Sequence, residues 1–247
     1  MVIPYRNISM VGEKLMTALL EFPQDWQRAL IIVAHPDDPE YGMAAAVAQW
    51  LAAGKEVSYV LATRGEAGIA GLAPEKSGPL RTREQENACA VIGVSDLVIL
   101  DHPDGRILEG LALRRDLARQ IRRVRPDVVL TLNHRDEWGP GRWNTADHRA
   151  VGRAVLDAVA DADNEWIFPE LLEEGFARHK TRWVALSSPQ PTHAQTVSAE
   201  SIEMAVASLA EHKEYLVALS ADPVVDQARK QVERVTEGGT VDFELYG

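Results

Sequence analysis

The chain has 247 residues, a length that can bury a sizeable core and fits one large α/β domain. It carries 26 Lys and Arg against 37 Asp and Glu, so its formal net charge is -11 at pH 7. The sequence has no block of basic residues to neutralise phosphates, which argues against general nucleic-acid binding.

No apolar run approaches the ~20 residues that a membrane span needs. Residues 1–16 also lack the basic start, apolar centre and small-residue cleavage site of a signal peptide. The single cysteine, Cys89, lies in an apolar pattern typical of a small buried side chain and forms no disulfide within the chain. We therefore expect a soluble cytoplasmic protein, and the absence of a Ser/Gly/Pro-rich linker indicates a single domain over 1–247.

Short β-rich runs alternate with longer segments in which apolar residues recur at helical spacing. This alternation predicts an α/β fold with a Rossmann-like, mainly parallel sheet flanked by helices, and a core at about 28–160. The C-terminal part is expected to complete the rim of the site and to pack a long helix on this core. Strands are expected at 29–35, 56–64, 96–102, 127–133 and 182–188, and helices at 41–54, 81–93, 108–126, 146–162 and 198–219.

Polar loops follow the first four expected strands, with the sequences HPDDPE, TRGEAG, DHPDG and NHRDEWGPGRWNTADH. An open α/β sheet binds its ligands in the crevice at the carboxyl ends of its strands. Four such loops from consecutive strands are expected to converge on one rim, where we expect the functional site.

The first of these loops is rich in groups that carry charge. Asp38 precedes Pro39 and is a good helix N-cap, and Glu40 would add a favourable charge at the helix start. Capping leaves His35 and Asp37 unexplained. Histidine and carboxylate oxygen are ligand types for zinc or ferrous iron, and a third ligand commonly comes from a distant loop. His148, in TADHRAV, is the best candidate for it.

The ordered motifs resemble one known family. AHPDDPEYG, TRGEAG, the Arg-X-X-Glu spacing in TREQENACAVIGV, DHPDGR, RPDVVLT and DHRAVGRAV follow one another over about 30–159. This series is similar to that of the LmbE-like, or PIG-L, de-N-acetylases, zinc-dependent hydrolases that act mostly on N-acetylglucosaminyl compounds. The resemblance implies a hydrolase that removes an acetyl or other acyl group from the amide nitrogen of a small amino-sugar metabolite.

The resemblance also implies roles for residues of the first and last motifs. His35, Asp38 and His148 would hold Zn²⁺, with Fe²⁺ as the alternative, and Asp37 would be the general base that takes a proton from water. Zinc lowers the pKa of its water to about 7, so a nearby carboxylate can complete the deprotonation near neutral pH.

One position departs from the family pattern. Many members have a histidine three residues before the ligand histidine, where it can serve the oxyanion or the leaving amine, and this chain has Thr145 there. A neutral hydroxyl cannot supply the imidazolium proton. His193 is the first candidate to take this catalytic role and His134 the second, although each is as readily an ordinary loop histidine.

The resemblance places further residues around the substrate. Arg64, Glu66, Arg83 and Asp104 would contact the sugar, although Arg83 could instead pair with Glu84 or Glu86 on its own helix. Asp147 would orient a ligand histidine or cap its helix, and Glu40 would support the turn from behind the ligands.

Two other features are expected at the rim. The loop 65–79 is rich in Gly and Pro and could cover the sugar as a movable rim or simply be mobile. Trp138 or Trp143 could stack on a sugar ring, although burial as an ordinary hydrophobic residue is at least as well supported.

Several alternatives stay open. Within the same chemistry, the substrate could be a thiol-sugar conjugate or a natural product tailored by deacylation. A noncatalytic relative that keeps the metal is a second alternative. A nucleotide-binding module is disfavoured because the first loop is acidic and has no Gly-X-Gly-X-X-Gly. The expected partner is a small molecule, and a homo-oligomer is left open.

Overall fold

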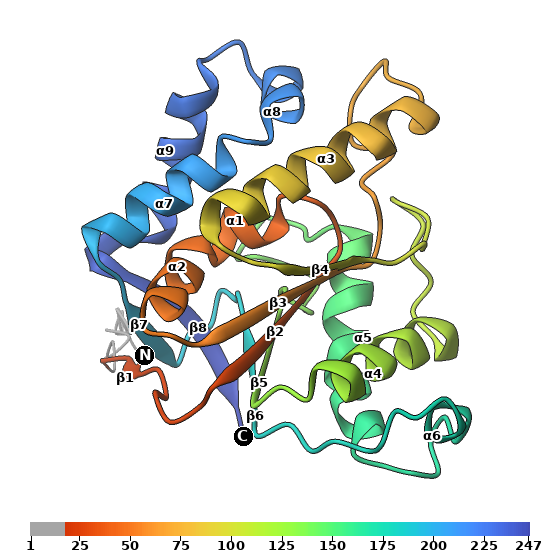
Figure 1. Cartoon of the computed structure of the whole chain (residues 1–247). Helices are drawn as coiled ribbons and strands as arrows, with labels where there is room; N and C mark the ends of the chain where they lie inside the picture. Colours follow the sequence, from red (N-terminus) through yellow and green to blue (C-terminus); the bar gives the residue numbers. More distant parts are fainter. Residues whose placement is uncertain (1–17) are drawn as a thin grey trace, which may run out of the picture.

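One eight-stranded sheet runs through the computed structural model, which describes residues 18–247 (Figure 1). The strand order is β1-β7-β8-β6-β5-β2-β3-β4, and β8 alone runs antiparallel to its two neighbours. The sequence prediction of a mainly parallel sheet is therefore confirmed. The strands are β1 (Leu20–Glu21), β2 (Arg28–Val33), β3 (Glu56–Leu61), β4 (Asp96–Ile99), β5 (Val128–Thr131), β6 (Trp183–Leu186), β7 (His193–Thr196) and β8 (Thr240–Tyr246).

Helices cover both faces of this sheet. Helices α1, α2, α3, α7, α8 and α9 lie on one side and α4, α5 and α6 on the other (Figure 1). Their bounds are α1 (Asp38–Gly42), α2 (Ala44–Ala52), α3 (Pro74–Ile92), α4 (Leu111–Val124), α5 (Ala146–Ala162), α6 (Glu170–Glu173), α7 (Ala199–Leu209), α8 (Lys213–Leu219) and α9 (Val224–Val235), with a short 3-10 helix η1 (Glu237–Gly239) before β8.

Strand β2 forms the centre of the core, between β3 and β5. Its residues from Ala29 to Val33 are all buried, which is why this run reads as continuously apolar. Cys89 is also buried, as its apolar context predicted. Because β2, β3, β4 and β5 are parallel, their carboxyl ends meet at one edge of the sheet, where the polar loops lie.

Three expected helices differ from the structure. The expected helix 41–54 is two helices that break at Met43, and α3 begins at Pro74 rather than 81 because Pro74 is suited to a first turn. The prediction of one long helix at 198–219 is wrong: α7 and α8 are separate, and His212 between them is fully buried. By contrast, α5 matches the helix expected at 146–162.

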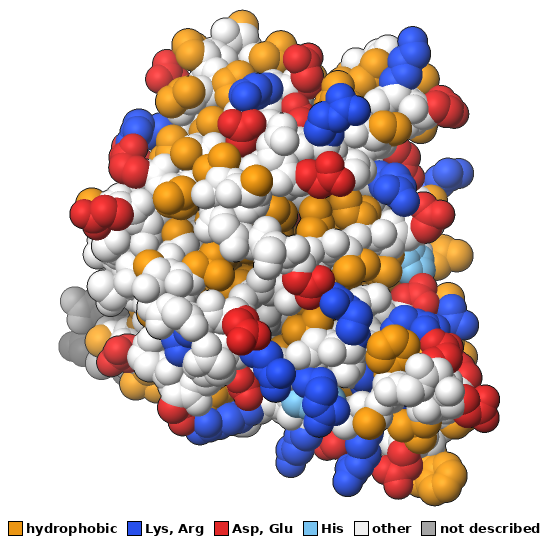
Figure 2. All heavy atoms as spheres, viewed as in Figure 1, with side chains coloured by type: hydrophobic (Ala, Val, Ile, Leu, Met, Phe, Trp, Pro, Cys, Tyr) orange, Lys and Arg blue, Asp and Glu red, His pale blue; other side chains and the backbone are white. Residues whose placement is uncertain are grey.

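On the face seen in Figure 2, acidic and basic side chains are interspersed, and neither sign forms one continuous block. Within residues 18–247, no helix is long and apolar enough to cross a membrane. The signal-peptide prediction rests on residues 1–16, which lie outside the part that the structure describes.

Candidate active site

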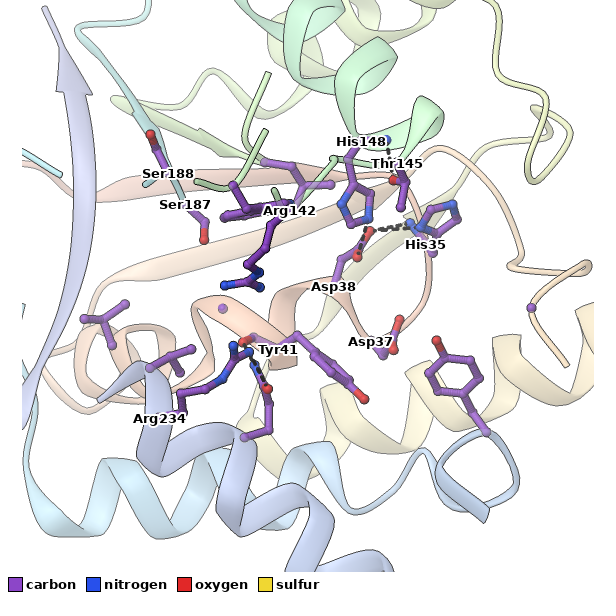
Figure 3. A pocket seen from close by; sticks show the side chains of 18 of the residues that line it. His35, Asp37, Asp38, Tyr41, Arg142, Thr145, His148, Ser187, Ser188 and Arg234 are labelled. Carbon is purple, nitrogen blue, oxygen red and sulfur yellow. Dashed lines mark hydrogen bonds and ion pairs between the residues drawn. The ribbon is translucent and has the colours of Figure 1, made fainter. Parts of the chain in front are cut away.

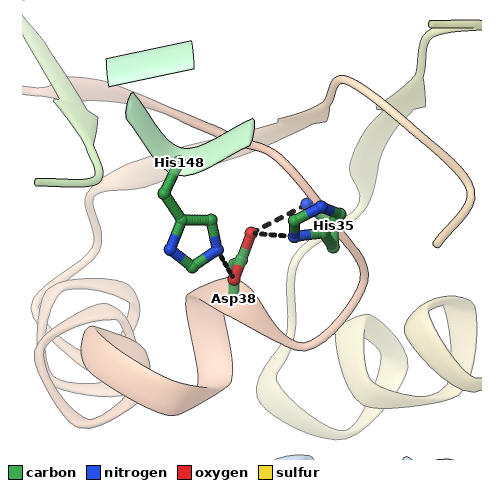
Figure 4. Close-up of side chains that lie close together, drawn as sticks. All are labelled: His35, Asp38 and His148. Atoms are coloured by element: carbon green, nitrogen blue, oxygen red, sulfur yellow. Dashed lines mark hydrogen bonds and ion pairs between the residues drawn. The ribbon is translucent and has the colours of Figure 1, made fainter. Parts of the chain in front are cut away.

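Three side chains from separate elements meet at the carboxyl end of β2. His35 follows β2, Asp38 begins α1, and His148 lies in the first turn of α5 (Figure 4). Asp38 Oδ1 is 3.0 Å from His148 Nε2, and Asp38 Oδ2 is 3.4 Å from His35 Nδ1. One ligand atom from each of the three lies within 4.8 Å of the others. This is the number and type of protein ligands that a catalytic zinc takes.

Local hydrogen bonds fix Asp38. Its Oδ2 accepts the backbone N–H groups of Ala34, at 3.1 Å, and His35, at 2.7 Å. Burial raises the pKa of Asp38, but His148 and His35 outweigh burial and hold that pKa well below its usual range. The carboxylate is therefore ionised, as a metal ligand must be.

Two carboxylates hold the far side of the His35 ring. His35 Nε2 is 3.1 Å from Asp104 Oδ1 and 3.3 Å from Asp147 Oδ2. Carboxylates on Nε2 favour a proton there, so Nδ1, the nitrogen that faces Asp38, is the one that could bind a metal. The pKa of His35 is raised: burial lowers it, but Asp38, Asp104 and Asp147 together outweigh burial.

His35, Asp104 and Asp147 also lie close enough together to hold an ion. However, Asp104 Oδ2 accepts the N–H of Ala67 at 2.7 Å, and Asp147 accepts those of Gly105 and Ile107 at 2.7 and 3.2 Å. Carboxylates already occupied by backbone donors suit an orienting role better than direct coordination.

The charges around His35, Asp38 and His148 favour a divalent cation. Asp37, Asp38, Asp104 and Asp147 are all buried within this small region, and Arg81 is the buried guanidinium that faces them. Buried carboxylates in excess of buried cations are costly unless a further positive charge balances them. The donor set and the charge excess therefore both fit a bound metal ion.

Asp37 lies beside the three ligands in a strained conformation. Its φ of 83° is left-handed, which is uncommon for a residue other than glycine. Arg81 Nη2 donates to Asp37 Oδ1 at 3.0 Å and to the carbonyl of Pro36 at 2.7 Å. The Tyr215 ring covers the guanidinium at 3.9 Å. Burial raises the pKa of Asp37 to about 6, against the lowering effect of Arg81.

Behind Asp37 lies a buried polar chain. Gln85 Oε1 accepts the backbone N–H of Asp37 at 2.9 Å, and Gln85 Nε2 donates to both oxygens of Glu40 at 3.2 and 3.3 Å. His212 Nε2 is 3.4 Å from Glu40 Oε2. Glu40 thus supports the loop from behind, and the break between α7 and α8 brings His212 to it.

The site forms the inner end of a cavity of about 580 Å³ (Figure 3). This volume suits a ligand of small-metabolite size. The cavity is lined by His35, Asp37, Asp38, Tyr41, Gly42, Gly68, Arg81, Asp104, Leu132, Trp138, Arg142, Thr145, His148, Ser187, Ser188, Tyr215, Gln231, Arg234, Val235, Val241 and Asp242.

The structure does not bring three of the expected sugar-contacting residues to this cavity. Arg64 is partly exposed and 3.4 Å from Asp101. Glu66 Oε1 accepts the backbone N–H of Asp104 at 2.9 Å, so it holds the loop. Arg83 is exposed on the outer face of α3. Asp104 does line the cavity, where it contacts His35.

Arg81 lies where Arg83 was expected, and the helical phase of α3 explains why. Arg81, Gln85 and Ala88 are buried on one face, whereas Arg83 falls on the opposite one. The segment contains two Arg-X-X-Glu pairs, one starting at Arg81 and one at Arg83. The position of the apolar residues on the helix indicates that Arg81 is the buried one.

Neither candidate histidine reaches the cavity that Thr145 lines. His193 lies on β7, where its Nδ1 is 2.9 Å from Thr192 Oγ1. His134 packs closely under α5: a Cβ added to Gly152 would lie 3.1 Å from the Cβ of His134. Among residues 18–247, the histidines that line the cavity are His35 and His148. Thr145 itself caps α5 by accepting the N–H of His148 at 3.3 Å.

The rim also differs from expectation. Because α3 begins at Pro74, the loop expected at 65–79 is shorter. Trp138 lines the cavity and donates from Nε1 to Asn144 Oδ1 at 2.9 Å, whereas Trp143 is exposed. Arg142, from the polar loop after β5, and Arg234, which has no motif around it, line the cavity as well.

Known proteins share both the fold and the motifs. The structure resembles N,N'-diacetylchitobiose deacetylase from Pyrococcus horikoshii, with a TM-score of 0.79 at 21% identity over 90% of this chain and 84% of that one. It also resembles GalB, the 4-carboxy-2-hydroxymuconate hydratase from Pseudomonas putida KT2440, with a TM-score of 0.67 at 16% identity over 89% and 95% of the two chains. Such likeness shows the fold, and the fold alone does not fix the reaction.

Sequence comparison is more specific. The chain is 32% identical over 196 residues to a 1D-myo-inositol 2-acetamido-2-deoxy-alpha-D-glucopyranoside deacetylase from Nakamurella multipartita, covering 66% of this chain and 64% of that protein. The matches span between 49% and 65% of the lengths of such curated relatives. Residues 30–159 match the family described as GlcNAc-PI de-N-acetylase, and this match covers more than half of the chain. The chain therefore belongs to the PIG-L family of GlcNAc-PI de-N-acetylases.

Proposed function

We propose that this protein is a metal-dependent hydrolase that removes an acetyl or other acyl group from the amide nitrogen of a small amino sugar. The observation that carries the proposal is the position of Asp37. Its buried carboxylate lies beside His35, Asp38 and His148 at the inner end of a cavity large enough for a sugar. The family to which the chain belongs supports this choice over other reactions of the same fold.

A Zn²⁺ or Fe²⁺ ion held by His35, Asp38 and His148 would supply a polarising charge for the amide carbonyl and an acidified water. Asp37 accepts the proton of the attacking water on its carboxylate. Arg81 holds that carboxylate in place, and Gln85 holds its backbone. Asp104 and Asp147 keep His35 turned toward Asp38.

Thr145 contributes a hydroxyl in place of the histidine of other family members. The hydroxyl accepts from His148 N, so its own hydrogen remains available to donate toward the developing oxyanion. It cannot protonate the leaving amine. Asp37, once protonated, is the group beside the site that can return a proton.

Acetate release on a panel of N-acetylglucosaminides, thiol-sugar conjugates and N-acyl amino sugars tests this proposal, with elemental analysis of the purified protein. Asp37→Asn should lower turnover by about 10²–10⁴-fold, typical of the loss of a general base, while the bound metal stays. The matched Asp38→Asn should lose the metal as well. Full activity of Asp37→Asn would overturn the mechanism.

The absence of an acidic group at Thr145 favours one other candidate, a relative that binds metal without catalysis. Stoichiometric metal together with no turnover on the whole panel would support that candidate and exclude the hydrolase.

A further inference from the structure

The end of the cavity away from the metal ligands is lined by two arginines. Arg142 comes from the loop between β5 and α5, and Arg234 comes from α9. Figure 3 shows the two side chains extending toward one another from opposite walls, so that both guanidinium groups face the same part of the cavity. Segments far apart in the sequence therefore place two positive charges around one space.

Within residues 18–247, neither guanidinium forms an ion pair with a carboxylate. Arg234 Nη2 donates to Gln231 Oε1, an uncharged amide, at 2.7 Å. Asp242 also lines the cavity, but its Oδ1 accepts from the Thr240 hydroxyl at 2.9 Å and it pairs with neither arginine. The other arginine on α9, Arg229, does have a carboxylate partner, Glu203, at 2.7 Å. Both charges at the cavity thus lack a carboxylate partner within the described part of the chain, although acidic residues outnumber basic ones in the chain.

Two guanidinium groups that face each other repel unless something negative lies between them. Arginine is well suited to bind carboxylate or phosphate because its planar fork can donate two hydrogen bonds to two oxygens. Ser187 lines the same region and can add a hydroxyl donor. Gly42 also lines the cavity, and a Cβ there would lie 3.2 Å from Ser187 Oγ, so the glycine keeps this space open.

We propose that Arg142 and Arg234 form a subsite for an anionic group, a carboxylate or a phosphate, carried by the substrate on the side of the sugar away from the acyl group. This proposal rests on the proposed function, because the metal ligands at the inner end place the acyl group. It narrows the substrate class from a neutral amino sugar to one with an acidic aglycone.

Equilibrium binding of amine products tests the subsite independently of catalysis, since these ligands have no acyl group to lose. Calorimetry on the metal-loaded protein should compare carboxymethyl 2-amino-2-deoxyglucoside with its neutral carbamoylmethyl counterpart, which has the same shape. A second arm compares 2-amino-2-deoxyglucose 1-phosphate with the methyl glycoside. Preference in the first arm assigns a carboxylate, and preference in the second a phosphate.

The anionic ligand of the matching arm should bind about tenfold more tightly than its neutral partner, as expected for charge-assisted hydrogen bonds at a partly exposed site. Arg142→Gln and Arg234→Gln should each remove most of this preference. Lys230→Gln, which removes an exposed charge from the same helix, should leave it intact. Equal binding in both arms, absence of binding by all four ligands, or a preference that persists in the double arginine variant would overturn the subsite.

The acetate-release assay stays separate from this measurement. Anion preference without acetate release refutes the hydrolase while the subsite stands. Acetate release from neutral glycosides without any anion preference refutes the subsite while the hydrolase stands.

Discussion

Gln85 holds the backbone of Asp37 through a 2.9 Å hydrogen bond from the Asp37 N–H to its Oε1. The same amide donates from Nε2 to Glu40, so its orientation is fixed from both ends. Asp37 has a left-handed φ of 83°, and such a conformation persists only where the surroundings enforce it. Gln85, which lies on α3 and has no motif of its own, therefore positions the proposed general base.

Changing Gln85 to Glu should disturb this arrangement. The new carboxylate would face Glu40 where the amide donates now, which leaves buried acceptors without a donor and costs about 1–3 kcal/mol of unfolding free energy. Repulsion from Glu40 should turn the new carboxylate away from the Asp37 N–H and release that turn, so we expect lower kcat with little change in KM. Chemical denaturation and steady-state kinetics measure both effects.

Asn87→Asp is the matched control, since it makes the same amide-to-acid change on the exposed face of α3. Unchanged stability and kcat in Gln85→Glu would contradict the positioning role.

Asp104 and Asp147 should control metal affinity without coordinating the metal. Both contact His35 Nε2, and groups that orient a ligand histidine typically contribute 10–100-fold in affinity. Asp104→Asn and Asp147→Asn should therefore weaken the metal by about this factor in competition with a chelator. Asp222→Asn, at an exposed turn, serves as the control. Complete loss of metal in Asp104→Asn would instead make that residue a ligand.

Thr145 has two separable roles. Its Oγ1 caps α5, and replacing a threonine cap with an apolar residue typically costs about 1 kcal/mol. Thr145→Val should lose this stability and also lower kcat through loss of the hydroxyl. Thr145→Ser should keep both the stability and the kcat of the wild type, as measured by denaturation and turnover. If Thr145→Val loses stability but keeps full kcat, the hydroxyl serves the helix alone.

The sequence could predict the central strands and α5 because apolar runs and helix stops are local features. The cluster proposed to hold the metal could also be located, since His35 and Asp38 belong to one short motif and His148 to another. The break at His212 could not be predicted, because no glycine or proline separates α7 from α8. In the structure His212 is buried at this break, 3.4 Å from Glu40. Strand β8 did leave a signal, the alternation of Val241, Phe243 and Leu245.

The pairing of arginines at the outer end of the cavity could not be predicted. Arg142 lies in a polar loop expected at the rim, but Arg234 lies 92 positions further along the chain and resembles an ordinary exposed arginine. Only the packing of α9 near the β5–α5 loop brings them to one cavity. The loop from His35 to Glu40 could be predicted, because its residues are adjacent in the chain.

The histidines chosen from sequence should have no catalytic effect. His193 lies on β7 and His134 lies under α5, and neither lines the cavity. His193→Asn and His134→Asn should therefore leave kcat/KM for the best substrate unchanged. A loss confined to kcat in either variant would show that the residue reaches the reacting atoms after all.

Glu244 on β8 should make stability depend on pH in the acid range. Its carboxylate accepts from Arg135 at 2.5 and 2.6 Å, from Ser188 at 2.6 Å and from Tyr246 at 2.5 Å. Burial raises the pKa of Glu244, but these hydrogen bonds outweigh burial and lower it from 4.5 to about 2. Because the folded state favours the ionised form, the contribution is complete above pH 4.5 and is lost as the pH falls toward 2.

Glu244→Gln should therefore destabilise the protein by about 2 kcal/mol at pH 7, since each unit of pKa shift corresponds to about 1.4 kcal/mol and the pair is partly solvated. The difference between wild type and variant should shrink steadily as the pH is lowered from 4.5 to 2.5. Denaturant unfolding at each pH measures it. Glu203→Gln, whose partner Arg229 lies on the surface, should show a much smaller difference at every pH. A Glu244→Gln difference that stays constant down to pH 2.5 would mean that packing, and not the charge of Glu244, carries the stabilisation.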